Sequence, residues 1–160
     1  SRGLGDVYKR QTVSIFEPGE YEVNNIPIQS HAIRLNTENL DESVNIYSVI
    51  TEGMTICYLN EISKITIPAN ITESIGKIDI LVCLSDDSSD KSVESINSLL
   101  SSLDPKVLII AEKNSNNNTS EIYEKLIKGL GHSPEDSVIN ANITKSNIAD
   151  ALKVVNLRKS

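Results

Sequence analysis

The chain has no tryptophan and one phenylalanine, and aromatic residues make up only 4% of its 160 positions. A core built from it must therefore consist mainly of isoleucine, leucine and valine, a composition that favours buried faces of β-sheet. With 39% hydrophobic and 23% charged residues, the chain is predicted to be globular rather than disordered. Its length suits one domain with a single core, or part of one.

Clusters of basic residues and long apolar runs are also missing. The formal net charge is -7, and lysine and arginine do not gather in any segment. A nucleic-acid partner is therefore not expected, because neutralising phosphates requires basic side chains on one face. No apolar run approaches the ~20 residues of a membrane span, and no signal peptide is visible. We expect a cytoplasmic protein with no membrane partner.

Cysteine is scarce, and its placement excludes several kinds of site. Cys57 and Cys83 each lie within an apolar run, and their spacing matches neither a CxxC pair nor a set of metal ligands. We predict that both are small hydrophobic residues buried in strands. The sequence also has no glycine-rich phosphate loop and no Ser/His/Asp or Cys/His nucleophile set.

The first half of the chain reads as consecutive short strands. Apolar or alternating runs are separated by polar stretches and turn signals, Pro18-Gly19 among them. Glu52-Gly53 stands between two such runs and predicts a hairpin. The predicted strands cover residues 13–16, 21–23, 26–33, 44–50 and 54–59.

The second half alternates strands with helices. Residues 78–84 are predicted to form a central strand buried on both faces, and residues 107–111 the next buried strand. Between them, Ser89-Asp90 can cap a helix that ends at Asp104-Pro105, which makes a right-handed βαβ unit. A weak helical or irregular segment is expected at residues 68–75. A later helix is expected to end at Gly129 or Gly131, and the last strand is expected at residues 152–157. The two longer helices carry apolar stripes, formed by Val93, Ile96, Leu99, Leu100 and Leu103 and by Ile122, Leu126, Ile127 and Leu130.

From about Thr12 to the end, this order resembles the C-terminal half of the metallo-β-lactamase fold, in the ascorbate-6-phosphate lactonase-like branch of Zn-dependent hydrolases. The resemblance implies an α/β fold, with a mixed sheet flanked by helices as the C-terminal part of an αββα sandwich. The segments that carry it are Pro18-Gly19-Glu20-Tyr21-Glu22-Val23, Ile56-Cys57-Tyr58-Leu59, Ile78-Asp79-Ile80-Leu81-Val82, Leu103-Asp104-Pro105-Lys106-Val107, and the tail from Leu126-Ile127-Lys128-Gly129-Leu130-Gly131 through Lys153-Val154-Val155.

The start of the sequence needs a separate interpretation. Residues 1–11 resemble a translated sequencing adapter of the kind found at broken ends of metagenome-assembled reading frames, and the only methionine is Met54. We therefore expect residues 12–160 to be a metallo-β-lactamase-like domain whose N-terminal part is missing. Such a fragment would expose a sheet and favour self-association through it.

The resemblance also implies where metal ligands would lie. The family's hairpin strand ends in a Gly-Asp that bridges two metal ions, and here those positions are Asn60 and Glu61. A later strand ends in a histidine ligand, matched here by Glu112, and an earlier histidine is matched by Leu35. Only Glu61 and Glu112 could bind metal, and the family's His-x-His-x-Asp-His motif would lie upstream of this sequence.

These substitutions predict a degenerate, hydrolase-like protein, a pseudoenzyme with no catalytic residues and no cofactor in this fragment. Without imidazole at the matching positions, nothing lowers the pKa of a metal-bound water toward neutrality. Two alternatives stay open: an active Zn-dependent hydrolase when the protein is full length, and a binding or dimerisation module without enzymatic activity.

Other candidate residues have less specific surroundings. Asp86, Asp87 and Asp90 follow the predicted central strand and Lys113 follows the next, an arrangement that also resembles a phosphoacceptor receiver domain. The β-rich first half has no place in that fold, so we expect Asp86 and Asp87 to be solvated loop residues and Asp90 to begin a helix.

The two histidines are weighed in the same way. His31 lies in a strand-like segment, where a packed or surface residue is the expectation and a shifted metal ligand the alternative. His132 follows Gly131 at a predicted helix end, where an imidazole can meet the last carbonyl groups.

Overall fold

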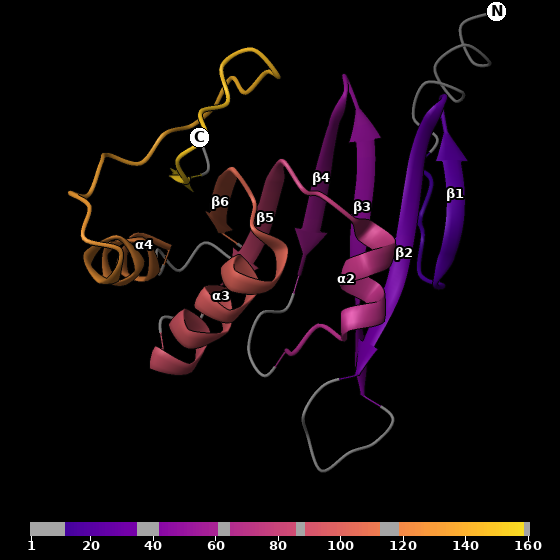
Figure 1. Ribbon diagram of the computed structural model, residues 1–160, viewed down its shortest axis with the longest axis horizontal. Coiled ribbons are helices and arrows are strands. Elements are labelled where there is room, and N and C mark those ends of the chain that lie inside the picture. The colour runs from indigo at the N-terminus through magenta and orange to yellow at the C-terminus, as the bar shows by residue number, and fades with distance from the viewer. Residues whose placement is uncertain (1–11, 35–41, 61–64, 86–88, 113–118, 159–160) are drawn as a thin grey trace, which may run out of the picture.

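A computed structural model describes residues 12–34, 42–60, 65–85, 89–112 and 119–158. Its strands form one seven-stranded sheet in the order β1-β2-β3-β4-β5-β6-β7 (Figure 1). Neighbours from β1 to β4 pair antiparallel, and neighbours from β4 to β7 pair parallel. The predicted α/β class, with a mixed sheet flanked by helices, is confirmed. The strands are β1 (Gly19–Val23), β2 (Ile26–Arg34), β3 (Ser43–Thr51), β4 (Met54–Leu59), β5 (Ile80–Ser85), β6 (Val107–Glu112) and β7 (Lys153–Leu157).

Two tight hairpins build the antiparallel half. Asn24 and Asn25 join β1 to β2 with φ of 51° and 62°, and Glu52 and Gly53 join β3 to β4 with φ of 50° and 73°. Positive φ at both central residues is characteristic of the type I′ turn. Its twist matches the right-handed twist of the two strands that it connects. The hairpin predicted at Glu52-Gly53 is confirmed.

The strand predicted at residues 13–16 is wrong. These residues form no strand, and they run beside β3 instead of pairing within the sheet. The Tyr47 hydroxyl donates to the Ile15 carbonyl at 2.9 Å, and Asn45 Nδ2 donates to the Phe16 carbonyl at 2.7 Å. Side chains of β3 thus bond the backbone of residues 15 and 16 in place of the backbone hydrogen bonds of a neighbouring strand. An apolar run in the sequence cannot distinguish these two arrangements.

The parallel half is built from the predicted strand-helix-strand unit. The helices are α2 (Ala69–Ile75), α3 (Asp90–Leu103) and α4 (Thr119–Gly129), and α3 connects β5 to β6. Ser89 caps α3, because its hydroxyl oxygen accepts a hydrogen bond from the Ser92 N–H at 3.3 Å. Asp104 ends α3 in the left-handed conformation, with φ of 44°. Both predicted ends of this helix are confirmed.

All three of these helices pack on one face of the sheet (Figure 1). The core between them and the sheet is aliphatic, and Leu81 of the central strand β5 is fully buried in it. Leu130, predicted as part of the α4 stripe, is instead 36% exposed, because the helix ends one residue earlier at Gly129. The buried helix residues in this core are Ile71, Ile75, Ile96, Leu99, Leu103, Ile122, Tyr123, Leu126 and Ile127.

The opposite face of the sheet has a smaller core. Met54, Ile80, Val107 and Val155 are buried there, with Ile143 and Ile148 of the chain before β7 packed against them. The side chains of Ile56, Val82 and Ile109 on this face are only partly buried. None of the described helices is both long and apolar enough to cross a membrane.

Local stability should differ between the two halves. We expect amide hydrogen exchange to be slowest in β5, α3 and β6, where strand and helix bury each other, and fastest in residues 13–33, at the edge of the sheet. Exchange measured by mass spectrometry on the monomer tests this. Slower exchange in residues 13–33 than in residues 80–112 would contradict it.

Candidate functional site

Five strands end at the same edge of the sheet. β2 and β4 are both antiparallel to β3 and so run in one direction, and β5, β6 and β7 are parallel to β4. In Figure 1 the arrowheads of β2 and β4 accordingly point the same way, opposite to those of β1 and β3. We call this the carboxyl edge; in open α/β sheets, the carboxyl ends of strands are where sites most often form.

The metal-ligand positions implied by the family resemblance fall, in the sequence, at the end of strands that end at the carboxyl edge or within two residues after them. Leu35 comes directly after β2, Glu61 comes two residues after the end of β4, and Glu112 is the last residue of β6. Leu35 and Glu61 lie outside the described residues, and Glu112 is described only as backbone. Asp86, Asp87 and Lys113 also lie outside them.

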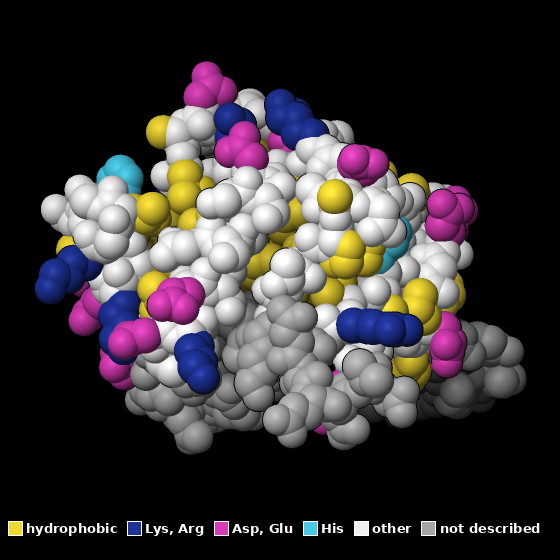
Figure 2. Space-filling view, turned by 60° about the horizontal axis from the view of Figure 1, so that its bottom comes forward, with side chains coloured by type: hydrophobic (Ala, Val, Ile, Leu, Met, Phe, Trp, Pro, Cys, Tyr) yellow, Lys and Arg dark blue, Asp and Glu magenta, His cyan; other side chains and the backbone are white. Residues whose placement is uncertain are grey.

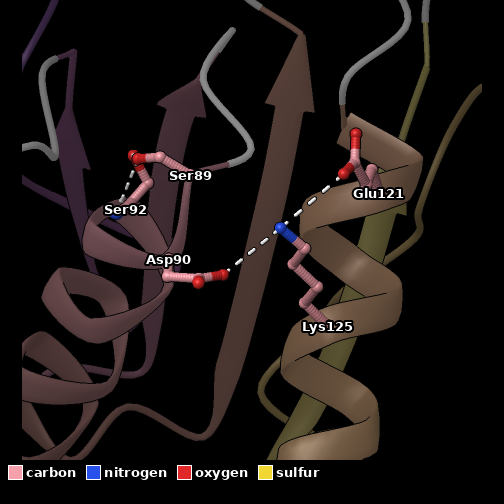
Figure 3. A network of polar contacts seen from close by, with 5 residues as sticks. All are labelled: Ser89, Asp90, Ser92, Glu121 and Lys125. Carbon is pink, nitrogen blue, oxygen red and sulfur yellow. Dashed lines mark hydrogen bonds and ion pairs between the residues drawn. The ribbon is translucent and has the colours of Figure 1, made fainter.

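One network of polar side chains near this edge joins α3 and α4 (Figure 3). The Lys125 ammonium lies 3.4 Å from Asp90 Oδ1 and 3.6 Å from Glu121 Oε1. The Asp90 side chain is 90% exposed, so these ion pairs are solvated and contribute on the order of 0–1 kcal/mol. Asp90 begins α3, as predicted, and its contact with Lys125 links the two helices.

The two histidines do not approach each other. His31 lies in β2, and its Nε2 is buried without a hydrogen-bond partner among the described residues. His132 is exposed beyond the end of α4, where its backbone N–H, and not its imidazole, donates to the Ile127 carbonyl at 3.1 Å. In Figure 2 the two cyan side chains lie on opposite sides of the view, with acidic and basic side chains interspersed between them. One metal ion cannot bind both.

The cysteines are buried in strands, as predicted. Cys57 lies in β4 and Cys83 in β5, and both are fully buried in the core under the helices. Burial raises the pKa of each thiol to about 12. Both thiols therefore stay protonated at neutral pH, the form that is a poor nucleophile and a poor metal ligand. Across the described part of the chain, no three His, Cys, Asp or Glu side chains are grouped so that they could hold a metal ion.

A buried carboxylate that the sequence did not single out lies at the opposite edge. Asp79 precedes β5, and its side chain is 10% exposed. One oxygen accepts from the Thr55 N–H at 2.9 Å, and the other accepts from the Lys145 ammonium at 2.9 Å. Burial acts to raise the pKa of Asp79, but these two hydrogen bonds, together with the positive charges of Lys145 and Lys77, outweigh it and hold the pKa below its ordinary value.

The contacts of Asp79 make it a structural residue. Its carbonyl accepts from the N–H groups of Lys106 and Val107, both at 3.0 Å, while its own N–H donates to the Thr55 carbonyl at 2.9 Å. The residue therefore fixes the starts of β5 and β6 and the hairpin strand β4 relative to one another. The sequence offers one signal for this role, which is the position of Asp79 next to a strand predicted to be buried. Its ion-pair partner Lys145 is 66 residues away, so the sequence does not reveal the pair.

Two buried serines offer a matched test of hydrogen bonding. Ser30 Oγ in β2 has no partner among the described residues, whereas the Ser92 hydroxyl in α3 meets the Ser89 hydroxyl at 3.3 Å. We expect Ser30→Ala to leave the unfolding free energy unchanged or raise it by up to about 1 kcal/mol, and Ser92→Ala to lower it by about 1 kcal/mol. Urea denaturation measures both. A larger loss for Ser30→Ala than for Ser92→Ala would show that the Ser30 hydroxyl is bonded.

Comparison with known proteins agrees with this geometry at the level of the fold. No family model matches the chain, and no curated protein matches it either. Among solved structures, the chain is similar to a Thermotoga maritima protein assigned to the Zn-dependent hydrolases of the metallo-β-lactamase superfamily. The TM-score is 0.67 at 20% identity, covering 91% of this chain and 72% of that one. The chain thus has a metallo-β-lactamase-like fold.

A second solved structure is much less similar. A variant of the CmlA β-hydroxylase aligns with a TM-score of 0.49 and 10% identity, over 68% of this chain and 28% of that chain. A likeness at this level adds nothing to the account of the site.

Proposed function

We propose that this chain is a degenerate metallo-β-lactamase-fold protein, which has the architecture of a Zn-dependent hydrolase but does not hydrolyse substrates through a metal-activated water. The likeness of fold supports the superfamily. The ascorbate-6-phosphate lactonase-like branch is proposed from the sequence resemblance alone. The proposed loss of activity rests on the identity of three residues, Leu35, Glu61 and Glu112, which in the sequence stand at or just after the ends of β2, β4 and β6.

The donor set does not fit zinc. A zinc site takes three or four protein ligands, drawn mainly from imidazole, thiolate and carboxylate. Leu35 has no donor atom, and Glu61 and Glu112 offer two carboxylates where the family has an aspartate and a histidine. A glutamate in place of aspartate also moves the carboxylate by one methylene, whereas metal-ligand distances vary by only about 0.2 Å.

Titration of the chain with Zn²⁺ in a calorimeter tests this proposal. We expect no binding tighter than about 10 μM, a free energy weaker than about -7 kcal/mol, because two carboxylates do not make a closed zinc site. Glu61→Ala and Glu112→Ala should leave the titration unchanged. Tight binding that either substitution abolishes would favour the alternative, a Zn-dependent hydrolase whose remaining ligands come from the full-length protein.

A second candidate function is a non-enzymatic dimerisation module. The partly buried side chains of Ile56, Val82 and Ile109 on the sheet face away from the helices favour it, as does the exposure of Phe16, at 78%. Apolar surface of this kind commonly marks an interaction site. Sedimentation velocity over a range of concentrations tests self-association, and Ile109→Lys should shift the distribution toward monomer.

A further inference from the structure

The outer edge of β7 has backbone groups that the sheet does not use. β7 is the last strand in the sheet order, and its inner edge pairs with β6. The Lys153 N–H donates to the Lys106 carbonyl at 3.0 Å, so the backbone of Lys153 points toward β6. Because successive residues of a strand direct their backbone groups to opposite edges, the N–H and C=O of Val154 point outward.

The chain before β7 follows this outer edge but pairs with it at one end only. The Val138 N–H donates to the Asn156 carbonyl, and the Arg158 N–H donates to the Val138 carbonyl, both at 2.9 Å. Val138 and Leu157 form an isolated parallel bridge. Among the described residues, none forms a hydrogen bond with the outward backbone groups of Val154. The outer edge is therefore open near the N-terminal end of β7, where Val154 presents one donor and one acceptor.

Two hollows lie along this open part of the edge. Their volumes are about 240 Å³ and 380 Å³, and both are lined by Tyr123, Glu135, Lys153 and Val154. The buried Tyr123 of α4 accepts a hydrogen bond from the Glu135 N–H at 2.8 Å, so α4 and residues 135–143 are tied together as walls beside the strand. The result is a narrow groove whose floor is the edge of β7.

The charge beside the groove is mainly negative. Glu135 and Asp136 are both exposed and both line the smaller hollow, where Lys153 is the basic residue. The whole chain carries a formal net charge of -7. A ligand with positive charge is therefore favoured over one with negative charge.

We propose that the outer edge of β7 binds a short, extended, positively charged peptide segment as an added strand. The main chain of the peptide would exchange hydrogen bonds with the N–H and C=O of Val154, while its basic side chains face Glu135 and Asp136. A bare peptide suits the groove better than a second copy of this chain. The strand of a second copy would arrive with its own sheet and helices and would meet the walls formed by α4 and residues 135–143.

The test uses the whole 160-residue chain and the capped peptide acetyl-Lys-Val-Lys-Val-Lys-amide. In ¹⁵N-edited NMR spectra we expect the largest shift change at the Val154 amide, together with slower hydrogen exchange of that amide. A peptide of the same sequence, N-methylated at alternate residues, cannot donate to the edge and should not bind. Glu135→Lys combined with Asp136→Lys should weaken binding of the parent peptide about tenfold, and these exposed positions leave the core intact.

Three results would overturn the proposal. The first is equal affinity of the chain for the parent peptide and for the N-methylated peptide. The second is a set of NMR chemical-shift changes whose largest members lie away from β7. The third is protection of the Val154 amide that depends on protein concentration without any peptide, which would assign the edge to a second copy of the chain.

Discussion

Leu81→Ala should lower the free energy of unfolding by about 2–5 kcal/mol. Leu81 is fully buried in the central strand β5, between β4 and β6 and beneath the helices. Its truncation removes apolar contacts and leaves a cavity that β5, paired on both sides, cannot close by moving. Chemical denaturation, with the slope of the transition compared between variants, gives the change directly.

Ile50→Ala is the matched control for this substitution. Ile50 is also an aliphatic residue in a strand, β3, but its side chain is 46% exposed. We expect a loss of less than about 1 kcal/mol, since little area is withdrawn from water. Equal losses for the two variants would mean that β5 is not the centre of the core.

Asp79→Asn should destabilise the protein by about 1–3 kcal/mol at neutral pH, because it removes the charge that Lys145 and the Thr55 N–H satisfy. The pKa of Asp79 is lowered in the folded state. Its contribution is therefore fully present above the unfolded pKa, about 3.9, and is lost as the pH falls through the folded pKa. The difference between the wild type and Asp79→Asn should accordingly shrink below about pH 4.

Urea denaturation of both proteins from pH 7 down to pH 3 measures this difference, and Lys145→Met serves as the control on the other side of the contact. Lys145 is 60% exposed, so its removal should cost less than the removal of Asp79. A difference between the wild type and Asp79→Asn that stays constant or grows on acidification would contradict the assigned role of the carboxylate.

Elements with strong local signals could be predicted from the sequence. The Glu52-Gly53 turn, the Ser89 cap and the apolar stripe of α3 each follow from the conformational and burial preferences of neighbouring residues. The strand predicted at residues 13–16 failed because hydrogen bonds from Asn45 and Tyr47 decide its conformation, and both lie about thirty positions away. Local preference carries no information on such partners.

The site could be predicted less completely than the fold. The family resemblance indicated Leu35, Glu61 and Glu112, and the strands that end at or just before these positions, β2, β4 and β6, run in the same direction. Leu35 and Glu61 themselves lie outside the described residues. The Asp79–Lys145 ion pair and the Tyr123–Glu135 hydrogen bond were not anticipated, because their partners are separated in sequence and follow no motif.

The central proposal, a metallo-β-lactamase-like fold without a metal centre of its own, is tested most directly by elemental analysis of the purified chain after incubation with Zn²⁺ and exhaustive dialysis. We expect far less than one zinc per chain, because Leu35, Glu61 and Glu112, at or just after the ends of β2, β4 and β6 in the sequence, do not provide three ligands. One or two zinc ions per chain, lost on Glu61→Ala or Glu112→Ala, would contradict it.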